Sequence, residues 1–179
     1  MRCFIGIPLP GRVRKALVKA QDGFRHVDAR MRLVKEPNLH ITLHFLGGVD
    51  NVDKVDESLR EVSFSSFKAS LKNLSFFPKK SYIRVIHSPV KNGRQQVIEL
   101  YDKVAEALSL DPEDRFTPHA TLARVKFVKS TNALARACYD VRFEESFTVK
   151  SFNLYNSDLT PKGPVYEVIS TYTPKDLKK

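Results

Sequence analysis

The chain carries one four-residue pattern twice, His-x-Thr-Leu, at His40-Ile41-Thr42-Leu43 and at His119-Ala120-Thr121-Leu122. The two histidines are 79 positions apart. In an extended strand, residues i and i+2 point to the same face. Each copy therefore presents an imidazole beside a hydroxyl and turns its other two residues toward a core. If the two strands lie next to each other, two imidazoles and two hydroxyls face one groove, an arrangement suited to acid–base chemistry on a phosphodiester.

Length and charge limit what surrounds this pair of motifs. The 179 residues suffice for one domain spanning 1–179, built as two small lobes around a shared core. The hydrophobic fraction of 42% is that of a globular protein. Lys and Arg exceed Asp and Glu by 30 to 20, a net charge of +10 that favours polyanions, with nucleic acid first among them. The alternative is a basic surface that serves solubility alone.

The expected location is the cytoplasm. No stretch approaches 18 consecutive apolar residues, so no membrane span is expected. The apolar run near the start is too short for a signal peptide and is broken by Pro8. Cys3 and Cys138 belong to no CxxC pair and are expected to be buried thiols in a reducing compartment. A monomer is the default expectation.

Hydrophobic periodicity and turn residues predict an α+β fold. Strands are expected at 2–8, 31–34, 39–46, 67–77, 82–87, 118–128, 143–154 and 165–172. Helices are expected at 12–27, from Asn51 or Asp53 to 62, at 95–108 before a stop at Asp111-Pro112, and at 131–138. The charged tail 175–179 is expected to fray. The order of elements repeats, so we expect two antiparallel or mixed sheets with outer helices around a central cleft, and a pseudo-two-fold relation between the two motif strands.

Rival chemistries have little support in the sequence. Neither motif carries an Asp, Glu or Cys at a useful offset, and HExxH is absent, so we expect no metal. GxSxG, GxGxxG and GxxxxGK[ST] are also absent, which argues against a serine nucleophile and against a phosphate-binding loop. No cofactor is expected. A two-histidine mechanism needs none of these, because one neutral imidazole takes a proton from water while the other delivers a proton to the leaving oxygen. The two Thr hydroxyls and a cation then hold the non-bridging oxygens.

Three further histidines need a separate interpretation. By the period of two, His44 shares a face with His40, and we assign it either a place at the groove edge or a structural role. His26 lies at the end of a predicted helix, where an imidazolium suits the helix dipole. His87 ends a predicted strand and is expected at the surface.

In its two motifs and their flanks the chain resembles a known family, the 2H phosphoesterases with paired HxTx motifs. The branch it is most similar to is RNA 2′,3′-cyclic phosphodiesterase, also called 2′-5′ RNA ligase. The segments that carry the resemblance span nearly the whole chain: Arg2-Cys3-Phe4-Ile5-Gly6-Ile7-Pro8, 38–47, 118–124 and 152–160.

The resemblance implies a bilobal fold with a central cleft and no metal. It implies hydrolysis of a 2′,3′-cyclic phosphate to a 2′-phosphomonoester, and the reverse joining of RNA ends through a 2′-5′ link. Its partner would be RNA with cyclic phosphate ends, with tRNA fragments as one candidate. It assigns His40 as the proton donor to the leaving 3′-oxygen and His119 as the proton acceptor from water. Arg124 would contact phosphate, and Phe45 would be an aromatic side chain at the pocket.

One detail departs from simple strand geometry. Phe45 and Arg124 each lie five residues after a motif histidine, and five is odd. Alternation alone therefore places both on the face opposite their histidines, unless a bulge or a strand end turns them inward. A core position remains the alternative for Phe45. Arg124 is costlier to bury, which favours a role in the site.

Two other functions remain open from the sequence. One is a non-catalytic RNA-binding protein that uses the same basic cleft, although intact histidines in both motifs argue against it. The other is a 2H enzyme that acts on ADP-ribose cyclic phosphate or on a small cyclic nucleotide.

Overall fold

The computed structural model describes residues 1–111 and 115–175. Ten strands, four α-helices and one short 3-10 helix are present in these ranges. In chain order they are β1 (Arg2–Pro8), α1 (Gly11–Gln21), β2 (Ala29–Leu33), η1 (Glu36–Asn38), β3 (His40–Gly48), α2 (Val52–Arg60), β4 (Phe67–Lys72), β5 (Ser75–Lys79), β6 (Tyr82–Pro89), α3 (Arg94–Leu108), β7 (His119–Val128), α4 (Thr131–Asp140), β8 (Glu144–Val149), β9 (Phe152–Thr160) and β10 (Gly163–Tyr172).

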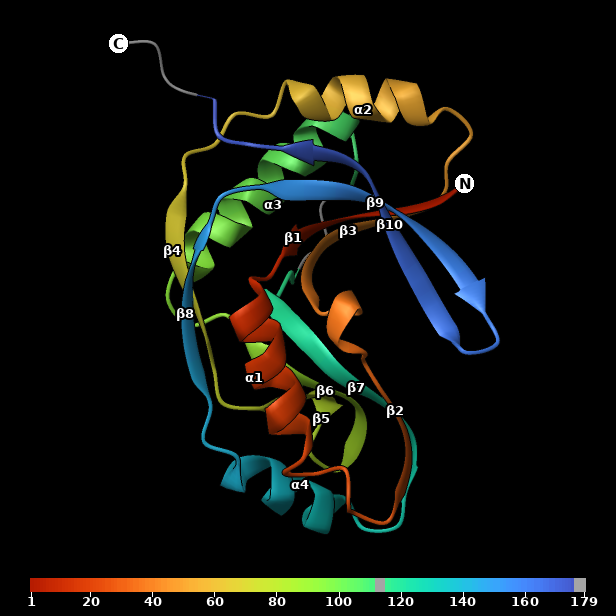
Figure 1. The fold of residues 1–179 in the computed structure, drawn as a ribbon, viewed down its shortest axis with the longest axis vertical. Coiled ribbons are helices and arrows are strands. Elements are labelled where there is room, and N and C mark those ends of the chain that lie inside the picture. Colours follow the sequence, from red (N-terminus) through yellow and green to blue (C-terminus); the bar gives the residue numbers. More distant parts are fainter. Residues whose placement is uncertain (112–114, 176–179) are drawn as a thin grey trace.

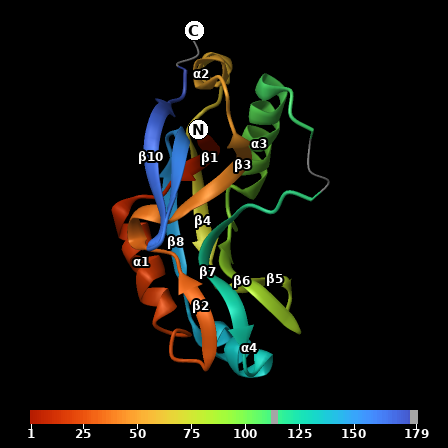
Figure 2. The same ribbon diagram turned by 90° about the vertical axis from the view of Figure 1, so that its right-hand side faces the viewer.

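One eight-stranded antiparallel sheet connects two lobes (Figures 1 and 2). Its strand order is β10-β9-β1-β3-β7-β6-β5, and β2 pairs with β7 beside this path. We call β1, β3, β9 and β10 the first lobe, and β2, β5, β6 and β7 the second lobe. The two lobes meet at β3 and β7, whose paired residues are Ile41 and Ala120. Outside the large sheet, β4 pairs antiparallel with β8.

The strand registers reveal the expected pseudo-two-fold relation. The first repeat is β1-α1-β3-α2-β4-β5 and the second is β6-α3-β7-α4-β8-β9, with β2, η1 and β10 as additions. In both repeats the first strand pairs with the motif strand at matching positions. The matching pairs are Pro8–His40 with Pro89–His119, Gly6–Thr42 with His87–Thr121, and Phe4–Phe45 with Val85–Arg124.

The helices cross over between the lobes. α1 follows β1 of the first lobe but contacts β7 of the second, whereas α3 follows β6 of the second lobe and contacts β3 of the first (Figure 1). The outer strands cross over in the same way, since β9 pairs with β1 and β5 with β6. Each lobe is therefore completed by the other half of the chain. The predicted α+β class with outer helices is confirmed.

The residues between His and Thr in each motif point into the core, as predicted. Ile41, Ala120 and Leu122 are fully buried, and Leu43 is 4% exposed. Apolar positions on the helices close the core from outside, because Val13 and Leu17 on α1 have no exposed surface. Burial of such side chains contributes about 1.5–3 kcal/mol each. One face of each motif strand is thus packed into the core, and the other face is left open.

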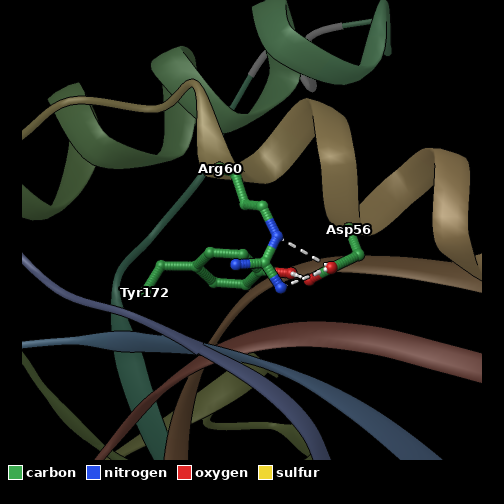
Figure 3. A network of polar contacts seen from close by, with 3 residues as sticks. All are labelled: Asp56, Arg60 and Tyr172. Carbon is green, nitrogen blue, oxygen red and sulfur yellow. Dashed lines mark hydrogen bonds and ion pairs between the residues drawn. The ribbon is translucent and has the colours of Figure 1, made fainter.

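A polar cluster fastens α2 to β10 (Figure 3). The Tyr172 hydroxyl donates to Asp56 Oδ1 over 2.6 Å, and Arg60 donates to Asp56 Oδ2 through Nε and Nη2 over 2.9 and 2.7 Å. Burial alone would raise the pKa of Asp56, but hydrogen bonds from Tyr172, Ser170 and Arg60 outweigh it and lower that pKa. Burial and Asp56 together raise the pKa of Tyr172. The carboxylate is therefore ionised and shared by a helix and a strand.

Several predicted boundaries need correction. The single strands expected at 67–77 and 143–154 are each two strands, divided near Asn73, whose φ is +57°, and at 150–151. The first helix ends at Gln21 instead of 27, so His26 lies beyond it. Part of the predicted stop at Asp111-Pro112 and most of the tail 175–179 fall outside the described residues. Within the described ranges, no helix has the length and apolar character needed to cross a membrane.

Candidate active site

The strand register brings the two motifs together on one face. Ile41 of β3 lies directly opposite Ala120 of β7, and both are fully buried. Because neighbours along a strand point to opposite faces, His40 and His119 project away from that core on the same side of the sheet. Both imidazoles are half-buried.

Each imidazole is oriented by the backbone two residues before it. His40 Nδ1 donates to the Asn38 carbonyl over 2.7 Å, and His119 Nδ1 donates to the Thr117 carbonyl over 2.6 Å. A proton on Nδ1 leaves Nε2 as the nitrogen available for proton transfer in the neutral ring. His40 Nε2 lies 2.8 Å from Thr42 Oγ1, within its own motif.

A bulge at the leucine of each motif resolves the problem of the odd spacing. Along β3, Thr42 and His44 pair with consecutive residues of β1, so Leu43 is skipped. Along β7, Thr121 and Ala123 pair with consecutive residues of β6, so Leu122 is skipped. A bulge inserts one residue and changes which face the following residues occupy. The residues five positions after each histidine, Phe45 and Arg124, therefore return to the face of the histidines.

The same bulge turns His44 away from the groove. His44 is 8% exposed and stacks on Tyr101 of α3, with ring centroids 3.9 Å apart. Its Nε2 lies 2.8 Å from the Tyr101 carbonyl. The shared face expected from simple alternation is wrong, and the structural alternative holds: His44 fastens β3 to α3.

A cavity of about 530 Å³ lies over the two motifs. Of the six predicted site residues, its wall includes His40, Thr42, Phe45, Thr121 and Arg124. Phe45 is 70% exposed, so the alternative of a core position is wrong. His119 is not part of this wall, whereas Thr121, two residues after it on β7, is. The wall also contains residues that the sequence did not single out, chiefly the cations Arg2, Arg32, Lys35 and Lys162 and the aromatics Phe4 and Tyr166.

Aromatic rings hold His40 in place. Its ring centroid lies 4.8 Å from that of Phe4 and 5.5 Å from that of Tyr166, which meets it edge-on. Phe4 in turn stacks on Tyr155 at 4.7 Å. Gly6 leaves the space for this packing, because a Cβ there would lie 3.0 Å from His40 Cδ2. The His40 imidazole is therefore fixed by packing as well as by its hydrogen bonds.

His119 has a different neighbour at the equivalent position. His87 occupies the place that Gly6 has in the other repeat, and its ring centroid lies 5.0 Å from that of His119. His87 also stacks on Phe77 at 3.9 Å. It is 3% exposed, so its predicted surface position is wrong. Within the described ranges, neither ring nitrogen of His87 makes a hydrogen bond of good geometry. The Phe76 backbone is a polar partner of this ring, and its effect is to raise the pKa of His87.

Burial and positive charge keep the site histidines neutral. Burial lowers the pKa of His40 to about 4; the hydrogen bond to Asn38 opposes this, and the charges of His119 and Arg124 add to it. Burial also lowers the pKa of His119, again with a contribution from Arg124. Burial lowers the pKa of His87 to about 3. In the free protein at neutral pH, all three rings are therefore uncharged, and an anion beside Arg124 would raise the first two pKa values.

Other reactive groups offer little at this site. Within residues 1–111 and 115–175, no three His, Cys, Asp or Glu side chains gather in a way that could hold a metal ion. Both cysteines are buried and unpaired, as predicted. Burial raises the pKa of Cys138 to about 12, which keeps it a thiol.

Comparisons with known proteins agree with this geometry. A family described as the 2′-5′ RNA ligase superfamily matches residues 14–161. A protein of Methanocaldococcus jannaschii named RNA 2′,3′-cyclic phosphodiesterase is 37% identical over 179 residues, which cover 96% of this chain and 100% of that protein. A protein of the same name from Thermotoga maritima is 32% identical and covers 94% of this chain and 93% of its own length.

Solved structures show the same fold. TT0787 of Thermus thermophilus superposes with a TM-score of 0.79 at 28% identity, covering 97% of both chains. LigT of E. coli, crystallised with 3′-AMP, superposes with a TM-score of 0.76 at 22% identity, also over 97% of both chains. The family match covers most of the chain, and the first relative exceeds 30% identity over nearly all of it. The chain therefore belongs to the 2′-5′ RNA ligase superfamily.

Proposed function

We propose that this protein is an RNA 2′,3′-cyclic phosphodiesterase, which opens the cyclic phosphate at an RNA end to a 2′-phosphomonoester. The observation that carries the proposal is the pairing of β3 with β7, which sets His40 and His119 on one face beside a cavity that contains Arg124. The relatives that bear this name support the same activity. Joining of RNA ends through a 2′-5′ link would be the reverse reaction at the same site.

The proposed reaction divides proton transfer between the two rings. His119 Nε2 accepts a proton from water as the water oxygen attacks phosphorus. The bond from phosphorus to O3′ breaks, and His40 Nε2 donates a proton to that oxygen. The products are a 2′-phosphomonoester and a 3′-hydroxyl. Arg124 and the hydroxyls of Thr42 and Thr121 hold the non-bridging oxygens as charge builds on them.

Binding of the substrate would prepare His40 for its role. A neutral ring cannot donate a proton to a leaving alkoxide from Nε2, because that nitrogen carries none while Nδ1 holds the proton. The phosphodiester is an anion, so it offsets Arg124 and raises the pKa values of both histidines. His40 would then be protonated mainly in the complex. This division of roles is part of the proposal.

We further propose that the whole chain acts as one bilobal domain and as a monomer in the cytoplasm. The substrates would be RNA ends that carry a 2′,3′-cyclic phosphate, with tRNA fragments among them. The continuous sheet through both lobes and the unpaired cysteines support this setting.

The proposal is tested with a short RNA that ends in a 2′,3′-cyclic phosphate, incubated in EDTA. We expect a 2′-phosphorylated product and no 3′-phosphorylated one, at an undiminished rate, because no step needs a divalent ion. ADP-ribose 1″,2″-cyclic phosphate and a 2′,3′-cyclic mononucleotide serve as competitors. Preference for either over the RNA would indicate a different 2H substrate, and RNA binding without turnover would indicate a non-catalytic protein.

A further inference from the structure

Positive charge is concentrated on the strands of one lobe. The second-lobe strands contain no Asp or Glu and six cations, which are Arg30, Arg32, Lys79, Arg84, Arg124 and Lys126. The first-lobe strands contain one cation, Arg2, and two acids, Asp158 and Glu167. A polyanion bound at the cleft is therefore attracted toward the second lobe.

These cations share the open face of the second lobe with the cleft. Arg32 pairs with Arg124 across β2 and β7, and both belong to the wall of the cavity. Two residues farther along β2, Arg30 is exposed on the same face and pairs with Phe127. Met31, between the two arginines, packs against the core. The helices α1 and α4 cover the opposite face of this sheet (Figure 2).

Two exposed aromatic rings lie among the cations. Phe127 is 62% exposed and Tyr82 is 55% exposed. The Arg84 guanidinium lies over the Tyr82 ring, 5.5 Å from its centroid, and also donates to the Lys126 carbonyl over 3.0 Å. Ile83 between Tyr82 and Arg84 is buried, so these two side chains face away from the core. We call the set Arg30, Tyr82, Arg84, Lys126 and Phe127 the basic strip.

We propose that the basic strip binds the RNA segment that immediately precedes the cyclic phosphate end. This inference rests on the proposed function. Single-stranded RNA is bound by cations that follow its phosphates and by aromatic rings on which its bases stack, and the strip supplies both. From Thr121 in the cleft to Phe127, β7 extends about 20 Å, enough for a short single-stranded segment.

The asymmetry of the two repeats sets the direction. Phe45 and Arg124 occupy equivalent positions, so one side of the cleft offers an aromatic ring and the other a cation. The terminal base stacks on the Phe45 side. The terminal cyclic phosphate lies at Arg124, and the preceding phosphates pass over Arg32 and continue to Arg30. In the opposite direction, the β9-β10 hairpin offers the phosphates a single cation in the cavity wall, Lys162.

The test uses a fluorescent ten-nucleotide RNA ending in a 2′-phosphate, the product of the proposed reaction, with binding measured by anisotropy. The variant is Arg30→Gln combined with Phe127→Ser, both outside the cavity wall. We expect about tenfold weaker binding, since a lost base stack alone has an effect of this size. The dependence of log K on log salt should fall by about 0.7 for the lost phosphate contact.

Matched controls lie on the helices behind the sheet. Lys15→Gln on α1 combined with Tyr139→Ser on α4 makes the same change in charge and removes a ring that is 52% exposed. We expect wild-type affinity from this control. The single variants Arg30→Gln and Phe127→Ser should each show part of the loss, so a folding defect in the double variant would not decide the result.

Hydrolysis separates this inference from the proposed function. The strip variant should lose efficiency on the ten-nucleotide cyclic phosphate and keep wild-type turnover of a 2′,3′-cyclic mononucleotide. Wild-type affinity in the strip variant, or equal losses in the control, would contradict RNA binding by the basic strip. If the wild-type protein binds the RNA through the basic strip but hydrolyses neither substrate, the strip is confirmed as an RNA-binding surface and the proposed function is wrong.

Discussion

At Gly6 the backbone of β1 passes so close to His40 that a methyl group would collide with it. The Cβ of an alanine would lie 3.0 Å from His40 Cδ2 and 3.0 Å from the Ile41 carbonyl oxygen. We predict that Gly6→Ala displaces the His40 ring and lowers kcat about tenfold or more, because small misplacements of a reacting group have large effects. Turnover of a 2′,3′-cyclic mononucleotide measures this.

The control for this prediction is Gly48→Ala at the far end of β3. A Cβ at Gly48 meets no atom within 4 Å. This variant should keep wild-type kcat. A Gly6→Ala protein that folds and turns over as fast as the wild type would show that the close contact has no bearing on His40.

Arg124 sets the charge environment of both site histidines. Its guanidinium lowers the pKa values of His40 and His119, so its removal should raise both. We predict that Arg124→Gln moves the two imidazole titrations, followed by NMR, to higher pH, while lowering kcat through loss of a phosphate contact. Arg94→Gln, on α3, is the control. Unchanged titrations in Arg124→Gln would place its charge too far from the rings to matter.

At the scale of single residues, the sequence predicted which motif side chains share a face better than it predicted the residues around them. The two His-x-Thr pairs and the buried residues between them followed from the period of two. Phe4, Tyr166 and His87 did not, because nothing in a single sequence says which ring contacts a given imidazole. One signal was present: Phe4-Ile5-Gly6-Ile7-Pro8 and Val85-Ile86-His87-Ser88-Pro89 occupy matching places before the first and second motifs.

Among the elements, the motif strands depend on their bulges. Leu43 and Leu122 look like ordinary strand residues, so periodicity alone put Phe45 and Arg124 on the face opposite the histidines and His44 on the same face as His40. The register to β1 and β6 reverses all three assignments. A bulge is fixed by the pairing of two strands, which a local pattern does not contain. The divided strands at 67–79 and 144–160 were missed because no Gly or Pro marks either break.

The contact between α2 and β10 shows how much one polar contact between two elements contributes to the stability of the fold. Tyr172→Phe removes a 2.6 Å hydrogen bond to an ionised Asp56 whose side chain is 19% exposed. We predict a decrease of about 1.5–3 kcal/mol in the free energy of unfolding, the usual range for a hydrogen bond to a charged group. Urea denaturation at pH 7 measures it, and kcat should stay unchanged.

Two further variants make this prediction sharper. Tyr139→Phe, at an exposed position on α4, is the matched control and should leave the free energy of unfolding unchanged. Folding lowers the pKa of Asp56, so its contribution is present above its unfolded pKa of about 3.9 and is lost as the pH falls through the folded value. Asp56→Asn should lack this acid-dependent part. A Tyr172→Phe protein as stable as wild type would show that the polar cluster between α2 and β10 does not stabilise the fold.

Across the whole molecule, two similar halves exchange helices and outer strands around one cleft. The sequence predicted the repeat from its paired motifs, but it did not predict the exchange. The reason is physical: whether α1 covers its own strand or that of the other half depends on how the lobes pack, and the apolar periodicity of a helix does not specify which sheet it covers. The difference between the halves lies in single positions, with Gly6 and Phe45 in one and His87 and Arg124 in the other.

His87 connects the stability of this fold to pH. Its pKa falls from about 6.5 in the unfolded chain to about 3 in the fold, so the unfolded state binds one more proton between these values. The contribution of His87 to the free energy of unfolding is therefore full above about pH 6.5 and decreases as the pH falls toward 3. We predict that His87→Phe flattens this decrease by up to about 1.4 kcal/mol per pH unit. Urea denaturation between pH 4 and pH 7 tests it, and an unchanged slope would contradict a buried neutral ring.

The most direct measurement is turnover of a 2′,3′-cyclic phosphate by His40→Ala, His119→Ala and the double variant. Each single change should lower kcat by about 10²-fold or more, because each removes one proton-transfer partner. The double variant should lose less than the product of the single losses, since the pair acts as a unit. A substrate with a much better leaving group should restore His40→Ala selectively. Rescue of His119→Ala instead would reverse the roles, and full activity in either single variant would contradict a two-histidine reaction.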